Sequence, residues 1–349
     1  MDEVGSVAEP VAGQVAAADP TTAAVLGVHV ARANKIRRLR WAAVGSSVMM
    51  TVAIVLLLIG DSYATAAYSA VAVIAITIGN AQNLRAAGTD GWIPAAVAAM
   101  AQQPWRPVTA RVVRARPWST LVEIEDQGTF TPLRVRGLPS AFRAMISRTG
   151  TAWVIGPHGP WTFLRVTGSH TFWAANAPRR TPSPGALNER VDGAEVHRRL
   201  ARHLGIPVVT VLLVAFALLG MGFLVSVSWP GAWIAYLLYV LLISAIALRT
   251  ERHRLVNSRL PRLIADAHWT RFPVRLEPWQ LNAKGMTRAT AHFEVDGTHR
   301  TALLPAATAD VLGAATQEGA LWFAQAPETG KTVAVGFPNC PLLAVAEIR

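Results

Sequence analysis

The sequence predicts a membrane α + β protein in which two transmembrane helical hairpins, with four spans in all, are each followed by a small cytoplasmic antiparallel β barrel or roll with one short helix. Three observations carry this prediction. Only 15% of the 349 residues are charged, against about 25% in an ordinary soluble domain. The charge is missing in blocks long enough to span a bilayer. Each pair of blocks precedes a β-patterned segment of roughly 75 residues, so the chain is predicted to be an internal duplication.

The predicted spans are residues 41–60, 63–79, 206–227 and 232–248. The stretch 212–219 has no polar face, which disfavours the alternative of buried hairpins in a soluble protein. Arg and Lys flank the blocks, whereas the hairpin turns Asp61-Ser62 and Ser228 to Gly231 contain none. The positive-inside rule therefore predicts a multi-pass plasma-membrane protein with both termini in the cytoplasm. The lone Cys340 excludes an intrachain disulfide and is compatible with a reducing compartment.

Composition divides the chain into six segments. We expect a disordered N-terminal tail, a first helical hairpin with flanking helices, a first β module, a Pro-rich linker, a second hairpin with flanking helices and a second β module. Their predicted ranges are 1–24, 25–102, 103–177, 178–186, 187–267 and 268–349.

The first β module alternates apolar with polar residues, as half-buried antiparallel strands do. The alternation covers 108–116, 121–125 and 133–136, and a helix is predicted from Leu138-Pro139-Ser140-Ala141 to Gly150. The second module repeats several landmarks at offsets of about 164 to 169 residues. Trp105 corresponds to Trp269, the stretch Gly150 to Val154 corresponds to Gly319 to Phe323, and Gly168 corresponds to Gly336. The helix start at Leu138 corresponds to Leu304-Pro305-Ala306-Ala307.

The two modules differ in charge. Pro104 to Arg180 contains eleven arginines and three acidic residues, whereas His268 to Arg349 contains seven basic and seven acidic residues. A basic module beside an anionic leaflet is predicted to contact lipid headgroups or an acidic partner. Nucleic acid is the weaker alternative, because Trp in a small barrel is more often core than a base-stacking platform. The candidate contact residues are Arg111, Arg114, Arg116, Arg134 and Arg136.

The sequence offers no catalytic, cofactor-binding or metal-ligating motif. Gly330-Lys331-Thr332 resembles the end of a phosphate-binding loop, but Gln325 stands where the leading glycine is required. A membrane-bound hydrolase or transferase would need a pocket in which His158, His170 or His292 meets a carboxylate. We therefore predict no cofactor and no catalysis.

The bias to Arg over Lys, the abundance of Ala, Val and Gly, and the Arg-flanked apolar hairpins that precede each Trp-entry β module are together similar to uncharacterised multi-pass membrane proteins of actinobacteria. This resemblance is compositional and architectural. It implies no specific activity, cofactor or site residue.

The sequence thus predicts an anchored cytoplasmic interaction or assembly platform. Its expected partners are the lipid bilayer, cytoplasmic proteins and a second copy of the chain in a homo-oligomer. One alternative is a component of an oligomeric channel or transporter, although the predicted spans carry no charged residue that would line a pore. The other is the membrane-bound hydrolase or transferase with an unrecognised site.

Overall fold

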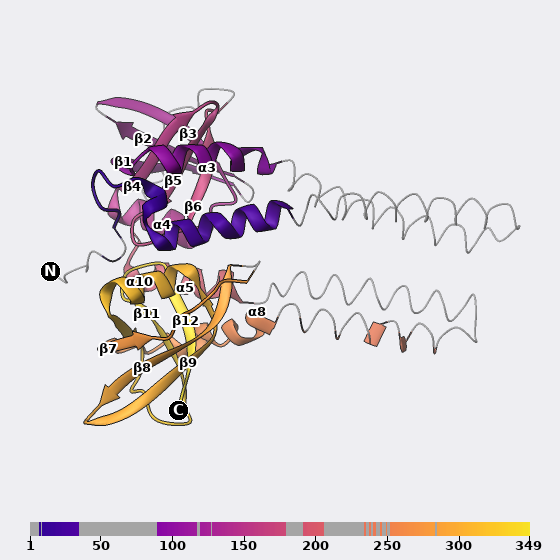
Figure 1. Cartoon of the computed structure of the whole chain (residues 1–349), viewed down its shortest axis with the longest axis vertical. Coiled ribbons are helices and arrows are strands. Elements are labelled where there is room, and N and C mark those ends of the chain that lie inside the picture. The colour runs from indigo at the N-terminus through magenta and orange to yellow at the C-terminus, as the bar shows by residue number, and fades with distance from the viewer. Residues whose placement is uncertain are drawn as a thin grey trace, which may run out of the picture. The chain divides into compact units, whose positions relative to one another are not determined.

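A computed structural model gives the structure of residues 7, 9–34, 89–116, 119–126, 128–178, 191–205, single positions between 234 and 249, 252–282 and 285–349. These residues form two closed antiparallel β barrels of six strands each, with short helices beside them (Figure 1). Both barrels belong to one compact unit, together with the N-terminal residues up to His29.

The structure corrects the predicted fold class. Among the residues described above, no helix is both long and apolar enough to cross a membrane. Helix α5, Gly193–Leu204, has 12 residues, which corresponds to about 18 Å against the roughly 30 Å of a bilayer core. The predicted spans 41–60, 63–79 and 206–227, and nearly all of 232–248, lie outside the described residues. The multi-pass plasma-membrane assignment, with both termini in the cytoplasm, depends on those spans and is corrected by the same finding.

The first barrel closes in the strand order β1-β2-β3-β6-β5-β4. Its inward-facing side chains are small or branched apolar residues such as Val108, Val122 and Leu164. Alternate residues of β1 to β3 point outward and are more exposed, as the two-residue period of a strand requires. The elements are β1 Arg106–Ala115, β2 Ser119–Asp126, β3 Thr129–Arg136, α4 Ser140–Thr149, β4 Thr151–His158, β5 Trp161–Val166 and β6 Phe172–Asn176.

The second barrel has the same topology, with the order β7-β8-β9-β12-β11-β10 around the closed sheet. Three phenylalanines, Phe272, Phe293 and Phe323, pack together inside it. The elements are β7 Thr270–Leu276, β8 Met286–Val295, β9 Thr298–Thr308, α10 Ala309–Glu318, β10 Ala320–Phe323, β11 Thr332–Phe337 and β12 Leu342–Ile348.

Equivalent positions in the two barrels follow from the strand registers. Helices α4 and α10 each lie between the third and fourth strands and end at a left-handed glycine, Gly150 and Gly319, a conformation that costs glycine little. From β2 to the middle of β4, counterparts lie 169 positions apart, as these two glycines do. Trp153 and Trp322 are one such pair. The shared strand order and registers support an internal duplication.

Two of the predicted landmarks are wrong. Leu304 to Ala307 end strand β9, and α10 begins only at Ala309. Gly336 pairs with Trp322 as Arg165 pairs with Trp153, so the counterpart of Gly336 is Arg165 and not Gly168.

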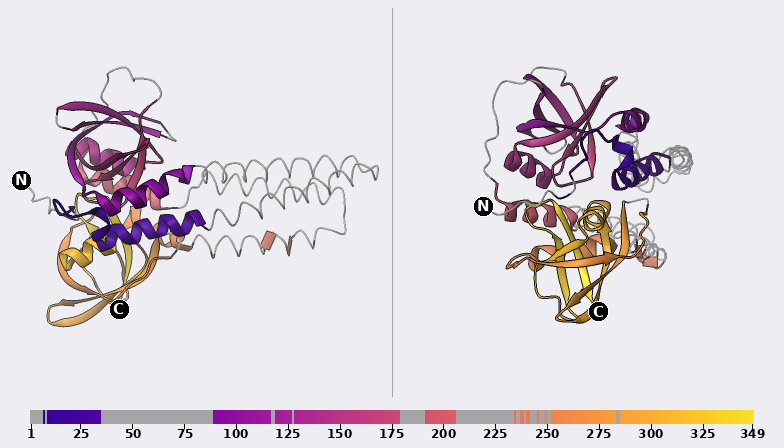
Figure 2. Two further views of the ribbon diagram at one scale, coloured as in Figure 1. Left: turned by 45° about the horizontal axis from the view of Figure 1, so that its top comes forward. Right: turned by 60° about the vertical axis from the view of Figure 1, so that its left-hand side comes forward.

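The N-terminal segment, residues 9–29, packs against both barrels. It contains η1, Ala16–Ala18, and the start of a helix that the structure describes over residues 20–34 (indigo in Figure 2). A Cβ at Gly313 of α10 would lie 2.3 Å from Cγ2 of Thr21, so the two helices approach closely. On the first barrel, His29 contacts the ring of Phe172. The prediction of a disordered tail over 1–24 is therefore corrected for residues 9–24.

Helices α3, α5 and α9 pack against the barrels. Helix α3 packs with the N-terminal segment on the outer face of the first barrel, where Trp105, Phe163 and Phe172 are buried. Helix α5 follows the Pro-rich linker and packs against α4 and β12. The bounds are η2 Thr89–Trp92, α3 Ile93–Gln102, α8 Arg252–Asn257 and α9 Leu260–Leu263.

Candidate functional site

The five predicted contact residues lie together on the outward face of β1, β2 and β3 and at the end of β1. All five are exposed. We name this surface the basic face. The structure thus brings the candidate residues onto one surface; whether they contact a partner stays a prediction. The basic face consists of Arg111, Arg114, Arg116, Arg134 and Arg136.

The strand registers set the spacing of these arginines. Arg114 and Arg134 flank Leu121 of β2, one on each side. In the next row of the sheet, Arg116 and Arg136 flank Ser119, since the Arg116 amide donates to the Ser119 carbonyl oxygen at 3.0 Å. Neighbouring strands lie about 4.8 Å apart. The side chains therefore form two rows of guanidinium groups with small neutral residues between them.

Arg111 differs from the other four. It forms an ion pair with Glu123 on β2 and lies over the ring of Phe130, with 5.7 Å between Cζ and the ring centroid. The other four arginines form no ion pair with any residue that the structure describes. Four positive charges on the basic face are therefore uncompensated by neighbouring acidic residues.

The second barrel shows that the fold does not require two of these arginines, Arg134 and Arg136. Leu303 and Pro305 stand 169 positions after Arg134 and Arg136, and Leu303 is buried. Thr290 replaces Leu121 in the corresponding row. Because the same scaffold forms with neutral residues at the positions of Arg134 and Arg136, closure of the barrel does not require these two arginines.

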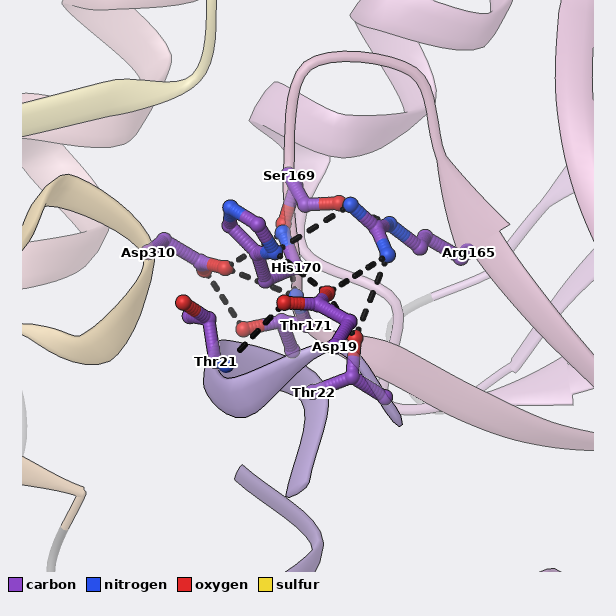
Figure 3. A network of polar contacts seen from close by, with 8 residues as sticks. All are labelled: Asp19, Thr21, Thr22, Arg165, Ser169, His170, Thr171 and Asp310. Carbon is purple, nitrogen blue, oxygen red and sulfur yellow. Dashed lines mark hydrogen bonds and ion pairs between the residues drawn. The ribbon is translucent and has the colours of Figure 1, made fainter. Parts of the chain in front are cut away.

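A second group of polar residues is buried where the N-terminal segment, the first barrel and α10 meet (Figure 3). Its centre is Arg165, whose side chain is 1% exposed although it faces outward from β5. The guanidinium donates to the carbonyl oxygen of Ser169 at 2.6 Å and to Oγ1 of Thr22 at 3.1 Å, and lies 3.4 Å from Oδ2 of Asp19. We call this group the buried cluster: Asp19, Thr22, Arg165, Ser169, His170, Thr171 and Asp310.

Asp310 links α10 of the second barrel to the turn before β6 of the first barrel through hydrogen bonds. Its Oδ1 accepts hydrogen bonds from the backbone amides of His170 and Thr171 at 2.6 and 2.7 Å. Its Oδ2 accepts one from the Thr171 hydroxyl at 2.5 Å. One carboxylate therefore satisfies three donors of the other barrel.

Asp19 is the N-cap of the helix over residues 20–34. Its Oδ1 accepts from the Thr21 amide at 3.0 Å, and Pro20 follows it, which is a common helix start. Burial favours the protonated acid, but the hydrogen bonds from His170 and Thr22 and the charge of Arg165 outweigh burial and hold the pKa of Asp19 well below its ordinary value. An ionised Asp19 has only acceptors, so Nδ1 of His170, 3.0 Å away, donates to it. The Arg165 guanidinium lies 3.2 Å from the same nitrogen, but it can only donate and therefore forms no hydrogen bond with a protonated Nδ1.

Sequence reasoning missed the buried cluster, although one local signal was present. Asp19-Pro20 fits a helix N-terminus. The partners Arg165 and Asp310 are far away in sequence, so no spacing connects them.

Of the three candidate histidines, His170 and His292 meet carboxylates, but not in a pocket, whereas His158, at the end of β4, meets no carboxylate of a described residue. His170 is 2% exposed and enclosed beside Asp19, out of reach of a substrate. His292 lies 2.9 Å from Glu277 on an exposed surface. Burial raises the pKa of the Cys340 thiol to about 12, so Cys340 is a poor nucleophile. Among the described residues, no group of three or more His, Cys, Asp or Glu side chains is placed to hold a metal ion.

No family model, curated protein or solved structure matches the chain. The resemblance to actinobacterial membrane proteins stays a prediction.

The lowered pKa of Asp19 predicts how stability depends on pH. Asp19→Asn should lower the free energy of unfolding by about 1–3 kcal/mol at pH 7. A depressed pKa contributes stability that is present above the unfolded value of 3.8 and is lost as the pH falls toward the folded value. The difference between wild type and variant should therefore be constant from about pH 5 to 8 and shrink below about pH 4, as followed by urea unfolding.

Asp192 is a matched control. It also caps a helix, accepting from the Glu195 amide at 2.6 Å, but its side chain is 70% exposed. Asp192→Asn should change the free energy of unfolding by a few tenths of a kcal/mol, because Asn is an equally good N-cap. A pH-independent loss for Asp19→Asn would show that the charge of Asp19 does not matter.

Proposed function

We propose that this protein is a non-catalytic interaction protein whose first barrel binds an acidic polypeptide through the basic face. The observation that carries the proposal is the two rows of uncompensated arginines, in a scaffold whose second copy has neutral residues at the positions of Arg134 and Arg136. Charges that the fold does not need and that no acid neutralises are available to a partner.

The chemistry of the basic face favours carboxylates. A guanidinium presents a planar fork that pairs with a carboxylate through two hydrogen bonds. Leu121, between Arg114 and Arg134, offers an apolar contact within the charged surface. An acidic segment with carboxylates on alternate residues of an extended strand would match this arrangement, because its side chains also repeat every second residue.

The test compares two quadruple variants of the full chain. The first replaces the four unpaired arginines of the basic face with Gln. It should weaken binding of a polyglutamate peptide by at least about tenfold, and wild-type binding should weaken as salt rises, since exposed charges are screened. The four residues replaced are Arg114, Arg116, Arg134 and Arg136.

The matched control removes the same charge from the second barrel by replacing Arg271, Arg275, Arg288 and Arg349 with Gln. It should bind polyglutamate nearly as wild type does. Equal losses in both variants would indicate a general effect of net charge and contradict a specific site. Preferential binding to vesicles containing phosphatidylglycerol would show that the ligand of the basic face is lipid, and preferential binding to a DNA duplex would show that it is nucleic acid. Either result would contradict an acidic polypeptide as the ligand.

A further inference from the structure

The second barrel has an open pocket of about 600 Å³ at one end. Its lining includes the half-buried ring of Phe272, the side chain of Thr270 and the residues around Gln325. Two carboxylates also contribute to it, Asp266 from the segment before β7 and Asp296 from the turn between β8 and β9. Neither carboxylate forms an ion pair with a residue that the structure describes.

The first barrel fills the equivalent place with one of its own side chains. Arg106 pairs with Val154 on β4, and Thr270 pairs with Phe323 on β10, so Thr270 is the counterpart of Arg106. The Arg106 guanidinium lies 2.7 Å from Oδ2 of Asp126 at the end of β2 and donates to the carbonyl oxygen of Gly156 at 2.9 Å.

The second barrel has a carboxylate and a backbone carbonyl group near the position of the Arg106 guanidinium, but it has Thr270 in place of the arginine. Gln325 stands 169 positions after Gly156 and belongs to the pocket lining, two residues after Phe323, the strand partner of Thr270. Val295 is the counterpart of Asp126, and Asp296 follows it directly. The carboxylate of the second barrel therefore lies one residue later in the chain than that of Asp126, in the turn after β8. Thr270 is too short to reach either group.

We propose that this pocket binds the guanidinium group of an arginine side chain that a partner polypeptide presents. The guanidinium would form charge-assisted hydrogen bonds with Asp296 and Asp266, donate to the Gln325 carbonyl oxygen as Arg106 does to Gly156, and lie against the ring of Phe272. The volume falls within the range of about 300–1,000 Å³ that ligand pockets occupy. This inference does not depend on the basic face of the first barrel.

Two basic side chains of the second barrel lie at or near the pocket: His268 is part of its lining, and Arg300 lies beside it. Arg300 on β9 donates to the carbonyl oxygen of Pro327, which belongs to the pocket lining. No ion pair joins Arg300 to Asp266 or Asp296 among the described residues, so both carboxylates stay available to a cationic ligand.

The experiment titrates the full-length chain with Nα-acetyl-arginine amide by isothermal calorimetry, with Nα-acetyl-citrulline amide as a neutral isostere. The arginine compound should bind at least tenfold more tightly than the citrulline compound. Asp296→Asn should weaken binding of the arginine compound by about tenfold. Thr270→Arg should abolish binding, because it supplies the guanidinium from the chain itself.

Glu294→Gln is the matched control, because Glu294 is an exposed acid two residues before Asp296, near the end of β8, and does not line the pocket. It should leave the affinity within about twofold of wild type. Circular dichroism confirms that each variant is folded, and Asp296→Asn keeps the test decisive if Thr270→Arg fails to fold. Equal binding of the citrulline compound, equal losses in the Asp296 and Glu294 variants, or no saturable binding of the arginine compound would each overturn the proposal.

Discussion

Arg165→Met is expected to lower the free energy of unfolding by about 3–5 kcal/mol, because it removes one partner of a buried ion pair and leaves the other partner without compensation. The Asp19 carboxylate would lose the guanidinium at 3.4 Å, and the Ser169 carbonyl oxygen would lose its donor at 2.6 Å. Met is nearly as long as Arg, so the change in packing is small. Urea unfolding at pH 7 measures the loss.

Arg106→Met is the control for this prediction. It is the same substitution in the same barrel, and it also breaks an ion pair, with Asp126 at 2.7 Å. The Arg106 side chain is 42% exposed, so solvent screens the pair and the expected loss is only about 0–1 kcal/mol. Equal losses in the two variants would contradict a special role for the buried cluster.

A double-mutant cycle identifies the partner that causes the loss. Asp19→Asn should cost clearly less in the Arg165→Met background than in the wild type, with a coupling of roughly 0.5–3 kcal/mol. Additive losses would mean that Arg165 stabilises the fold through its other hydrogen bonds.

Strand positions could be predicted from the sequence because a half-buried strand leaves a local signal. Val108 to Arg116 alternates Val with Arg, and nearly the same residues form β1 with Val108, Ala110 and Val112 inward. The same alternation predicts that Arg111 faces outward, but it would place Arg114 inward with Val112; a β-bulge between Val112 and Arg114 turns Arg114 outward. The alternation does not predict that Arg111 is neutralised by Glu123, since that pairing depends on the register between β1 and β2.

The duplication could be predicted only from landmarks with a fixed structural role. Gly150 and Gly319 both end a helix in the left-handed conformation, and the glycine is therefore retained at that position. Leu138-Pro139 and Leu304-Pro305 have no such shared role, because one pair precedes a helix and the other lies within β9. A match of residue types without a common backbone requirement misplaced the start of α10.

The N-terminal segment shows why composition failed as a guide to disorder. Residues 1–24 have little periodicity and small side chains, which usually indicates a chain that cannot bury enough apolar surface. Small side chains also suit close packing, and Thr21 packs against Gly313 where a larger residue would not fit. The partner surface lies on α10, so the order of this segment has no local signature.

Asp310→Ala is expected to lower the free energy of unfolding by about 3 kcal/mol, because it leaves the buried His170 amide without an acceptor and removes one of the two acceptors of the Thr171 amide, the other being the Ser169 hydroxyl at 3.0 Å. The amides of His170 and Thr171 should exchange with solvent faster by at least tenfold, as hydrogen exchange monitored by NMR would show. Glu318→Ala, at the other end of α10, should change neither quantity appreciably.

Asp310→Asn then separates hydrogen bonding from charge. Asn keeps a carbonyl oxygen at the position of Oδ1, which accepts from both backbone amides, and its amide group can donate to the Thr171 hydroxyl. If the hydrogen bonds hold α10 to the first barrel, Asp310→Asn should retain most of the stability and the slow exchange. If Asn is as harmful as Ala, the stabilising factor is instead the negative charge of Asp310 beside Arg165, and the contact between the barrels is electrostatic in origin.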